Sequence, residues 1–263
     1  MSAASPQPGR RAFLSIQNVA MHFGGLRALD DVSFDVERGS VLGLIGPNGS
    51  GKTTLMNVVS GVLKPTYGNV RFGGKRIADV PTYAVCRLGI ARTFQVVKPF
   101  ANLSVRENVA VGAMYGRNGG SRSARASFDH AQELLEIVGL ARVADRFASE
   151  LTVPDRKRLE VAKALALDPE VLLLDEVMAG LNATEVDEAL ELLRTINRRG
   201  TTLIVVEHLM KAIVSISTAI VVLAEGKKIA EGAPAEVLAS PRVIEAYLGA
   251  RYVKRQRQRE AGA

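Results

Sequence analysis

Nine consecutive residues decide the fold of this chain: Gly46-Pro47-Asn48-Gly49-Ser50-Gly51-Lys52-Thr53-Thr54. The apolar run 41–45 precedes them, and the mostly apolar run 55–59 follows them. This order predicts a strand, a glycine-rich loop and a helix. In that setting the nine residues match the phosphate-binding loop, whose pattern is G-x-x-x-x-G-K-[ST].

The chemistry of such a loop depends mainly on its backbone. Glycines let the chain curl with its N–H groups pointing inward, and the start of the next helix adds a positive dipole end, so main-chain donors hold a polyphosphate. We expect Lys52 to reach the β- and γ-phosphates and Thr53 to offer its hydroxyl to Mg²⁺. A glycine-rich turn without a ligand is the alternative. The candidate nucleotide-binding residues here are Gly46, Pro47, Asn48, Gly49, Ser50, Gly51, Lys52, Thr53 and Thr54.

A second strong pattern is an apolar run, 171–174, that ends in Asp175 and Glu176. A buried parallel strand of this kind delivers both carboxylates to its carboxyl end, where α/β sheets build their sites. We expect Asp175 to hold Mg²⁺, directly or through water. Glu176 is placed to orient the attacking water as a general base, a role worth typically about 10²–10⁴ in rate. A buried strand that ends in an acidic turn is the alternative.

Three further residues leave a choice between a structural and a functional role. Phe23 ends a predicted strand, where its ring either fills the core or offers a face for stacking adenine. Gln95 leaves the strand predicted over 89–94, and its amide oxygen can coordinate Mg²⁺ or the attacking water. His208 follows the strand predicted over 201–206, and it is either structural or a sensor of the γ-phosphate.

The remaining elements follow from hydrophobic periodicity and turn residues. We predict an antiparallel flap from 13–19 and 31–36, a hairpin over 69–77, and a small sheet from 221–223 and 228–230. Helices are predicted over 104–115, 128–138, 156–167 and 183–199, and two short ones within 234–248. Residues 96–153 are thus mostly helical and inserted between pieces of an α/β core.

Charge and composition argue against a basic body surface, an internal disulfide and a membrane span. The net charge is +7, but Arg10 and Arg11 contribute two of these charges and the segment 251–260 a net four, so the body is nearly neutral. The basic tail is either a solvated, disordered segment or weakly attracted to anionic lipid. The single cysteine, Cys86, permits no internal disulfide and fits a reducing compartment. No apolar run reaches the roughly 18 residues that a membrane span needs.

With these motifs, the chain resembles the ATP-binding subunits of ABC transporters. More narrowly, it is similar to those of branched-chain (hydrophobic) amino-acid uptake systems. The likeness covers nearly all of residues 13–252. It rests on the phosphate loop, 90–95, 102–109, the Asp175-Glu176 strand, 179–182, and Glu207-His208. The endings 231–234 and 246–249 match the narrower branch.

The resemblance implies an α/β fold: a P-loop NTPase (RecA-like) core with an antiparallel β flap and an inserted α-helical subdomain, as in ABC ATPases. It implies a single ABC ATPase domain over 12–250. Its parts would be a core of 12–95 and 154–232, a helical insert at about 96–153, and C-terminal helices at 233–250. A disordered leader at 1–11 and a basic tail at 251–263 would flank this domain.

The resemblance also implies roles for single residues, with ATP and Mg²⁺ as cofactors. Phe23 would stack on adenine, Gln95 would link Mg²⁺ to the transmembrane contact, and His208 would be the switch histidine. The expected catalytic residues are Lys52, Gln95, Glu176 and His208, and the expected Mg²⁺ ligands are Thr53, Gln95 and Asp175. Two subunits would close head to tail, each nucleotide lying between the phosphate loop of one and the signature segment of the other. Residues 96–100 and the helical insert would face the membrane subunits.

The signature segment departs from the family pattern. The family has Leu-Ser-Gly-Gly-Gln, whereas this chain has Leu151-Thr152-Val153-Pro154-Asp155. Thr152 keeps a hydroxyl that could meet the γ-phosphate, but Pro154 has no N–H to donate and Val153 restricts close backbone approach. The spacing from Thr152 to Asp155 is that of a capping box. A weakened half-site would suit a heterodimer whose partner carries the stricter signature, and a homodimer is the alternative. A second departure is Asn182, where the family usually has aspartate.

These inferences favour an ATP-hydrolysing, energy-coupling subunit of an importer for branched-chain or related amino acids. Its partners would be transmembrane permease subunits, a second ATP-binding subunit and, indirectly, an extracytoplasmic substrate-binding protein. It would lie peripherally on the cytoplasmic face of the inner (plasma) membrane. One alternative is an ABC subunit for another substrate such as urea. The other is a soluble ABC ATPase acting on nucleic acid or ribosomes, which the single cassette, the lack of heptads and the nearly neutral body disfavour.

Overall fold

The computed structural model describes residues 12–93, 98–118 and 122–248. The expectations for the leader 1–11, for the basic tail 251–263 and for Gln95 lie outside these residues. In the part of the chain that is described, no helix is long and apolar enough to cross a membrane.

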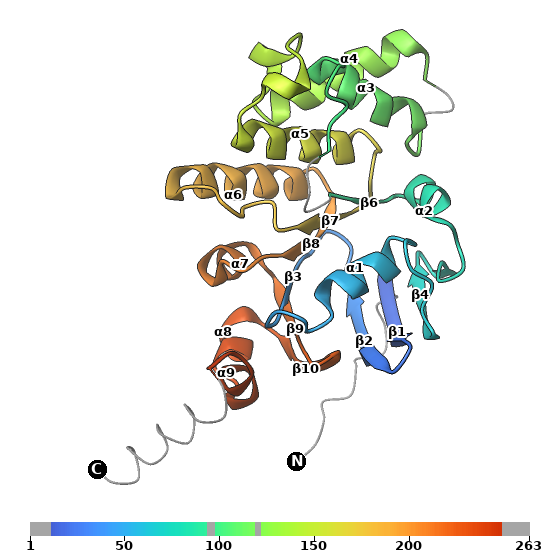
Figure 1. The fold of residues 1–263 in the computed structure, drawn as a ribbon, viewed down its shortest axis with the longest axis vertical. Coiled ribbons are helices and arrows are strands. Elements are labelled where there is room, and N and C mark those ends of the chain that lie inside the picture. Colours follow the sequence, from blue (N-terminus) through green and yellow to red (C-terminus); the bar gives the residue numbers. More distant parts are fainter. Residues whose placement is uncertain (1–11, 94–97, 119–121, 249–263) are drawn as a thin grey trace.

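A six-stranded sheet forms the centre of the molecule, with the strand order β10-β9-β3-β8-β7-β6 (Figure 1). Its strands are β3 (Val41–Ile45), β6 (Ile90–Arg92), β7 (Val171–Asp175), β8 (Thr202–Val206), β9 (Ala219–Ala224) and β10 (Lys227–Gly232). All neighbours pair in parallel except β10, which is antiparallel to β9. The carboxyl ends of the parallel strands therefore meet at one edge, where ligands bind in folds of this kind.

The strands predicted over 221–223 and 228–230 are present, but the sheet that they complete is the six-stranded central one and not a small one. Residues 221–223 and 228–230 lie in β9 and β10, and β9 pairs with β3 from Leu42↔Ala219 to Ile45↔Val222. The physical reason is burial, because residues 220–223 are all buried, as expected for an interior parallel strand covered on both faces. The two strands thus extend the central sheet beside the phosphate loop.

The predicted antiparallel flap is present as a second, four-stranded sheet with the order β2-β1-β4-β5. Its strands are β1 (Leu14–Phe23), β2 (Leu26–Val36), β4 (Tyr67–Phe72) and β5 (Lys75–Arg76). β1 and β2 are longer than expected because Gly24, with a φ of 58°, allows a tight turn directly after Phe23. The predicted hairpin over 69–77 is β4 and β5.

Helices surround the two sheets. They are α1 (Lys52–Val59), α2 (Thr82–Leu88), α3 (Val105–Tyr115), α4 (Ala124–Ile137), α5 (Val153–Leu165), α6 (Ala183–Arg198), α7 (Met210–Ile216), α8 (Pro234–Leu238) and α9 (Pro241–Leu248). Short 3-10 turns, η2 (Ala141–Val143) and η3 (Ala148–Glu150), precede α5. In Figure 1, α3 and α4 lie at the end of the molecule opposite α8 and α9. Helix α5 lies between the α3–α4 pair and α6.

Helix caps explain where several helices begin. Ser104 accepts a hydrogen bond from the Glu107 N–H, and the Glu107 carboxylate accepts one from the Ser104 N–H, so the predicted capping box opens α3. α4 begins four residues earlier than predicted because Ser123 caps it. α5 begins at Val153 rather than at Arg156, because the Thr152 hydroxyl caps its first turn.

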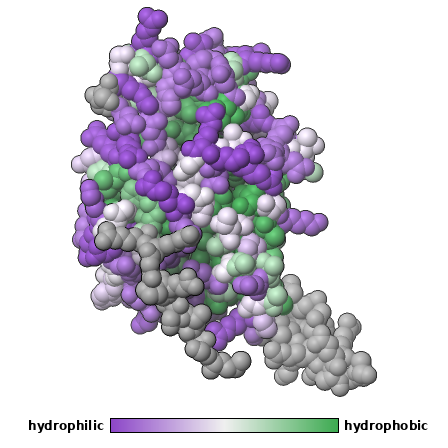
Figure 2. Space-filling view, turned by 180° about the vertical axis from the view of Figure 1, so that it is seen from behind, coloured by the Kyte–Doolittle hydropathy of each residue, from purple (hydrophilic) through white to green (hydrophobic). Residues whose placement is uncertain are grey.

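The core follows from the alternation of side chains along the central strands. In β7, Leu172 and Leu174 pack with the helical side of the molecule, whereas Val171 and Leu173 pack with the flap and α1. This alternation is the period of two that a strand imposes, so two apolar layers cover the sheet. On the face drawn in Figure 2, hydrophilic residues cover most of the surface and hydrophobic ones show between them. These observations confirm the predicted α/β fold.

Candidate nucleotide site

The loop between β3 and α1 has the close packing that its glycines predict. A Cβ atom at Gly46 would lie 2.1 Å from the Leu223 carbonyl oxygen, and one at Gly51 would lie 2.6 Å from that of Ala28. Gly51 also has a φ of 101°. Neither position therefore accepts a larger residue without a shift of the backbone. The strands β9 and β2 press on the loop from outside and fix its curl.

The side chains of the loop divide into buried and exposed groups. Asn48, Gly49 and Thr53 are exposed, Pro47 and Thr54 are partly buried, and Ser50 and Lys52 are buried. The Ser50 carbonyl accepts a hydrogen bond of 3.1 Å from the Gly226 N–H, which joins the loop to the turn between β9 and β10. The exposed residues are those that a ligand approaching from solvent would meet first.

Lys52 lies folded back over the loop. Its ammonium donates to the carbonyls of Gly46 and Pro47 at 2.8 and 3.0 Å. Burial lowers the pKa of Lys52, and the carboxylates of Glu176 and Asp175 act in the opposite direction. The structure thus brings the cation of the phosphate loop and the two acidic residues after β7 into one electrostatic neighbourhood.

Asp175 ends β7 and is almost completely buried. Its Oδ2 accepts a hydrogen bond of 2.8 Å from Arg92 of β6, and the two side chains are 3% and 6% exposed. Arg92 also donates to the side-chain oxygen of Asn57 in α1. One guanidinium therefore connects the acidic end of β7 to the helix that follows the phosphate loop.

Glu176, which follows Asp175 in the chain, contacts the side chain of His208. The distance between His208 Nε2 and Glu176 Oε1 is 2.8 Å. Glu176 is in a left-handed backbone conformation, with a φ of 53°, and its N–H donates to the Val206 carbonyl at 2.9 Å. This turn places its carboxylate beside the residues that follow β8. A carboxylate held between a histidine and a buried lysine can orient a water molecule for attack.

The ligands that Mg²⁺ prefers are present among these residues. The Asp175 carboxylate and the Thr53 hydroxyl are hard oxygen donors, which suit Mg²⁺. Among the described residues no group of three or more His, Cys, Asp and Glu side chains could hold a metal ion. An ion held by these two donors would complete its octahedral coordination with ligands from outside them, such as water and the phosphates of a nucleotide.

Two predicted residues lie apart from this cluster in the described contacts. Phe23 ends β1 with 47% of its surface exposed, so the alternative that its ring fills the core is wrong. Thr152 is exposed at the start of α5, where its hydroxyl donates to Asp155 Oδ2 at 2.8 Å and accepts from the Asp155 N–H at 3.3 Å. The capping box expected there is only half formed, because the Asp155 carboxylate bonds the hydroxyl of Thr152 and not its N–H.

The sequence analysis missed several residues that touch the site. They are Arg92, Lys157, Glu207 and Tyr247. Burial raises the pKa of Tyr247 in α9, and a hydrogen bond with the Gly46 backbone acts against this shift, so the C-terminal helix reaches the phosphate loop. Arg92 and Glu207 carry a usable signal, because a charged residue beside a buried apolar strand needs a partner. Lys157 and Tyr247 lie in helices, where nothing in the sequence sets them apart.

Two family models match this chain. The model of the family described as "ABC transporter" matches residues 29–179, and that of the "branched-chain amino acid ATP-binding cassette transporter" matches residues 227–253. The second match includes β10, α8 and α9.

Curated relatives are similar over almost their whole length. The high-affinity branched-chain amino acid transport ATP-binding protein LivG of Salmonella typhimurium is 38% identical over 90% of this chain and 97% of its own length. BraF of Pseudomonas aeruginosa, which carries the same description, is 36% identical over 91% of this chain and 98% of its own.

The fold also matches solved structures. An ATP-binding cassette of an ABC transporter in its ADP conformation superposes with a TM-score of 0.81 at 31% identity, covering 91% of this chain and all of that one. A nucleotide-free cassette gives the same TM-score and identity over 90% of this chain and 99% of that one. The chain therefore belongs to the ABC transporter family, as an ATP-binding cassette similar to those of branched-chain amino-acid transport.

Proposed function

We propose that this chain is the ATP-hydrolysing, energy-coupling subunit of an ABC importer for branched-chain or related amino acids. The observation that carries the proposal is the contact between Glu176 and His208 at the carboxyl edge of the central sheet, where the Glu176 carboxylate also acts electrostatically on Lys52 of the phosphate loop. Membership of the family and the similarity to LivG and BraF support transport as the function and branched-chain amino acids as the class of substrate.

Each residue of the site has a distinct task in this proposal. The backbone N–H groups of the loop 46–54 hold the phosphates, and Lys52 exchanges its two carbonyl partners for the β- and γ-phosphates. Glu176 accepts a proton from the attacking water, and His208 holds the Glu176 carboxylate in place through its Nε2. The exposed ring of Phe23 is available for stacking on adenine.

Mg²⁺ fits the donor set of Thr53 and Asp175, with Gln95 as a further ligand that lies outside the described residues. When bound, the ion neutralises charge on the phosphates during transfer. Arg92 keeps the buried Asp175 carboxylate in one orientation through a charge-assisted hydrogen bond, so its position is set before any ligand arrives.

The same proposal includes partners and a location. Transmembrane permease subunits, with an extracytoplasmic binding protein behind them, would select the amino acid, and the chain would lie on the cytoplasmic face of the membrane. A second ATP-binding subunit would complete each site with its signature segment. The mutual bond between Thr152 and Asp155 supports a heterodimer, because it engages the hydroxyl that a γ-phosphate would need.

ATP hydrolysis by the full chain in complex with its second ATP-binding subunit, measured without and with added Mg²⁺, tests the enzymatic part of this proposal. Glu176→Gln is expected to bind ATP and to lose roughly 10²–10⁴-fold in turnover, because the amide cannot take the proton. Lys52→Ala is expected to weaken ATP binding itself. Glu236→Gln is the matched control, because Glu236 is an exposed residue of α8. This variant should hydrolyse ATP like the wild type. Turnover by Glu176→Gln at the wild-type rate would refute the assignment of the base.

A further inference from the structure

The turn that carries Glu176 needs support from outside itself. It runs from Glu176 to Ala179 and is closed by a hydrogen bond of 3.2 Å from the Ala179 N–H to the Glu176 carbonyl. Glu176 has a φ of 53°, a left-handed conformation that is uncommon for a residue with a side chain. Such a conformation persists only where surrounding contacts hold it.

One support comes from Glu207, which directly precedes His208. Its Oε1 accepts a hydrogen bond of 2.6 Å from the N–H of Met178, in the middle of the turn. Glu207 is 3% exposed. Burial raises the pKa of Glu207, while the bond from Met178 and the positive charge of Lys157 act against this shift. A buried carboxyl group thus accepts a hydrogen bond from a backbone donor of the turn.

The other support comes from Lys157 of α5. Its ammonium donates to the Glu176 carbonyl at 3.3 Å and to the Ala179 carbonyl. These two carbonyls belong to the first and last residues of the turn. A lysine suits this task because its ammonium has three donors and no acceptor. A cation thus pairs with the backbone acceptors, as Glu207 pairs with the donor.

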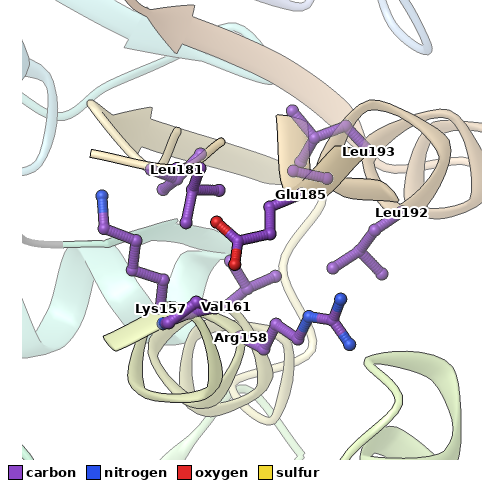
Figure 3. A pocket seen from close by; sticks show the side chains of 10 residues that line it. Lys157, Arg158, Val161, Leu181, Glu185, Leu192 and Leu193 are labelled. Carbon is purple, nitrogen blue, oxygen red and sulfur yellow. The ribbon is translucent and has the colours of Figure 1, made fainter. Parts of the chain in front are cut away.

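Charge and direction distinguish Lys157 from its neighbour in α5. Burial lowers the pKa of Lys157, and the carboxylates of Glu207 and Glu176 oppose this shift. In Figure 3, Lys157 extends from α5 toward the loop that carries Leu181, whereas Arg158 extends along the other side of the pocket. Arg158 instead pairs with the side chain of Glu188 in α6. Two adjacent cations in one helix therefore have different partners.

We propose that Lys157 and Glu207 are positioning residues for ATP hydrolysis. They hold the turn 176–179 from two sides, so that the Glu176 carboxylate stays against His208 and near Lys52. Because Lys157 lies in the helix that Thr152 caps, it also joins the helix that contains part of the signature segment to the turn of the general base. The inference rests on the proposed function, since it concerns the hydrolysis assigned there to Glu176.

The test compares Lys157→Met and Lys157→Arg in the full chain. Lys157→Met is expected to lower kcat roughly 10- to 100-fold, because a general base displaced by about 1 Å loses that much rate. The KM for ATP and the affinity for a fluorescent ATP analogue should stay within about twofold, since no phosphate ligand has changed. Lys157→Arg should recover part of the rate, because a guanidinium can also donate to two carbonyls.

Arg158→Met is the matched control, as it removes a cation from the same helix and the same pocket without touching the turn. It should keep the wild-type kcat. If Lys157→Met does not fold, Glu207→Leu provides the test: it removes the acceptor of the Met178 N–H at similar volume, and it should lower kcat with unchanged ATP affinity.

The outcomes separate this inference from the proposed function. A wild-type chain that hydrolyses no ATP even in complex with its second ATP-binding subunit and the membrane subunits would overturn both. If the wild type hydrolyses ATP and Lys157→Met matches it, the inference alone is wrong. An equal fall of kcat in Lys157→Met and Arg158→Met, or a parallel loss of ATP affinity, would also overturn it, because the effect would then come from α5 in general.

Discussion

Arg92→Met tests the contribution of the buried ion pair beneath the nucleotide site. Arg92 and Asp175 are 6% and 3% exposed and 2.8 Å apart. Removing the cation leaves a carboxylate buried without its charge partner, a change that costs roughly 3–5 kcal/mol in the free energy of unfolding. For a domain of this size we expect the melting temperature to fall by roughly 2–4 °C per kcal/mol.

A second ion pair provides the matched control. Arg106 and Asp145 are also in hydrogen-bond contact, at 2.6 Å, but their side chains are 34% and 85% exposed. Solvent screens such a pair, so Arg106→Met should cost no more than about 1 kcal/mol. The two substitutions remove the same groups and differ mainly in the burial of the carboxylate left behind.

Urea unfolding of the full chain without nucleotide or Mg²⁺ is the assay, because a ligand that binds the native state would add its own stabilisation. The double variant Arg92→Met/Asp175→Asn removes both charges and should recover most of the lost stability. The reasoning fails if Arg92→Met unfolds within about 1 kcal/mol of the wild type. It also fails if the double variant is as unstable as the two single changes added together.

Two further predictions concern sites away from this pair. Burial would raise the pKa of Asp168, but His130, whose Nε2 lies 3.3 Å from Asp168 Oδ1, and the Arg122 guanidinium, which donates to Asp168 Oδ2, outweigh it and lower the pKa from 3.8 to about 2. Because the pKa of Asp168 is lower in the folded state than in the unfolded state, its ionised form stabilises the fold by about 2 kcal/mol above about pH 5, and this stabilisation is lost as the pH falls toward 2. The difference in the free energy of unfolding between the wild type and Asp168→Asn should therefore shrink between pH 6 and pH 3. A constant difference would contradict this prediction. Phe23→Ala should weaken ATP binding but not the binding of tripolyphosphate, measured by calorimetry, and equal weakening of both would refute adenine stacking.

Much of the site was predictable because its motifs are local. The phosphate loop, the apolar strand before Asp175 and the residues after β8 each lie within one short stretch. Parallel strands bring their carboxyl ends to one edge of a sheet, so the meeting of Glu176 with His208 follows from topology. The helix capped by Ser104 was also predictable, since its capping box involves residues three apart.

The contacts that hold the site were not predictable, because each joins residues far apart in the chain. Arg92 meets Asn57 and Asp175, which are 35 and 83 residues away. Lys157 donates to backbone carbonyls, which every residue has, so no pattern of side chains in the sequence predicts the contact. The place of β9 beside β3 depends on a parallel pairing, whose partner strand is not fixed by any turn between the two.

Purification of the tagged full chain with its membrane partners tests the central claim most directly. The Glu176→Gln variant, solubilised from membranes in detergent with ATP to hold the closed state, would be captured and its companions identified by mass spectrometry. We expect two integral membrane subunits and a second ATP-binding subunit. The second ATP-binding subunit is a different chain from this one if it carries the stricter form of the signature that residues 151–155 lack. Capture without any membrane subunit, or with nucleic acid in its place, would contradict the assignment to an importer.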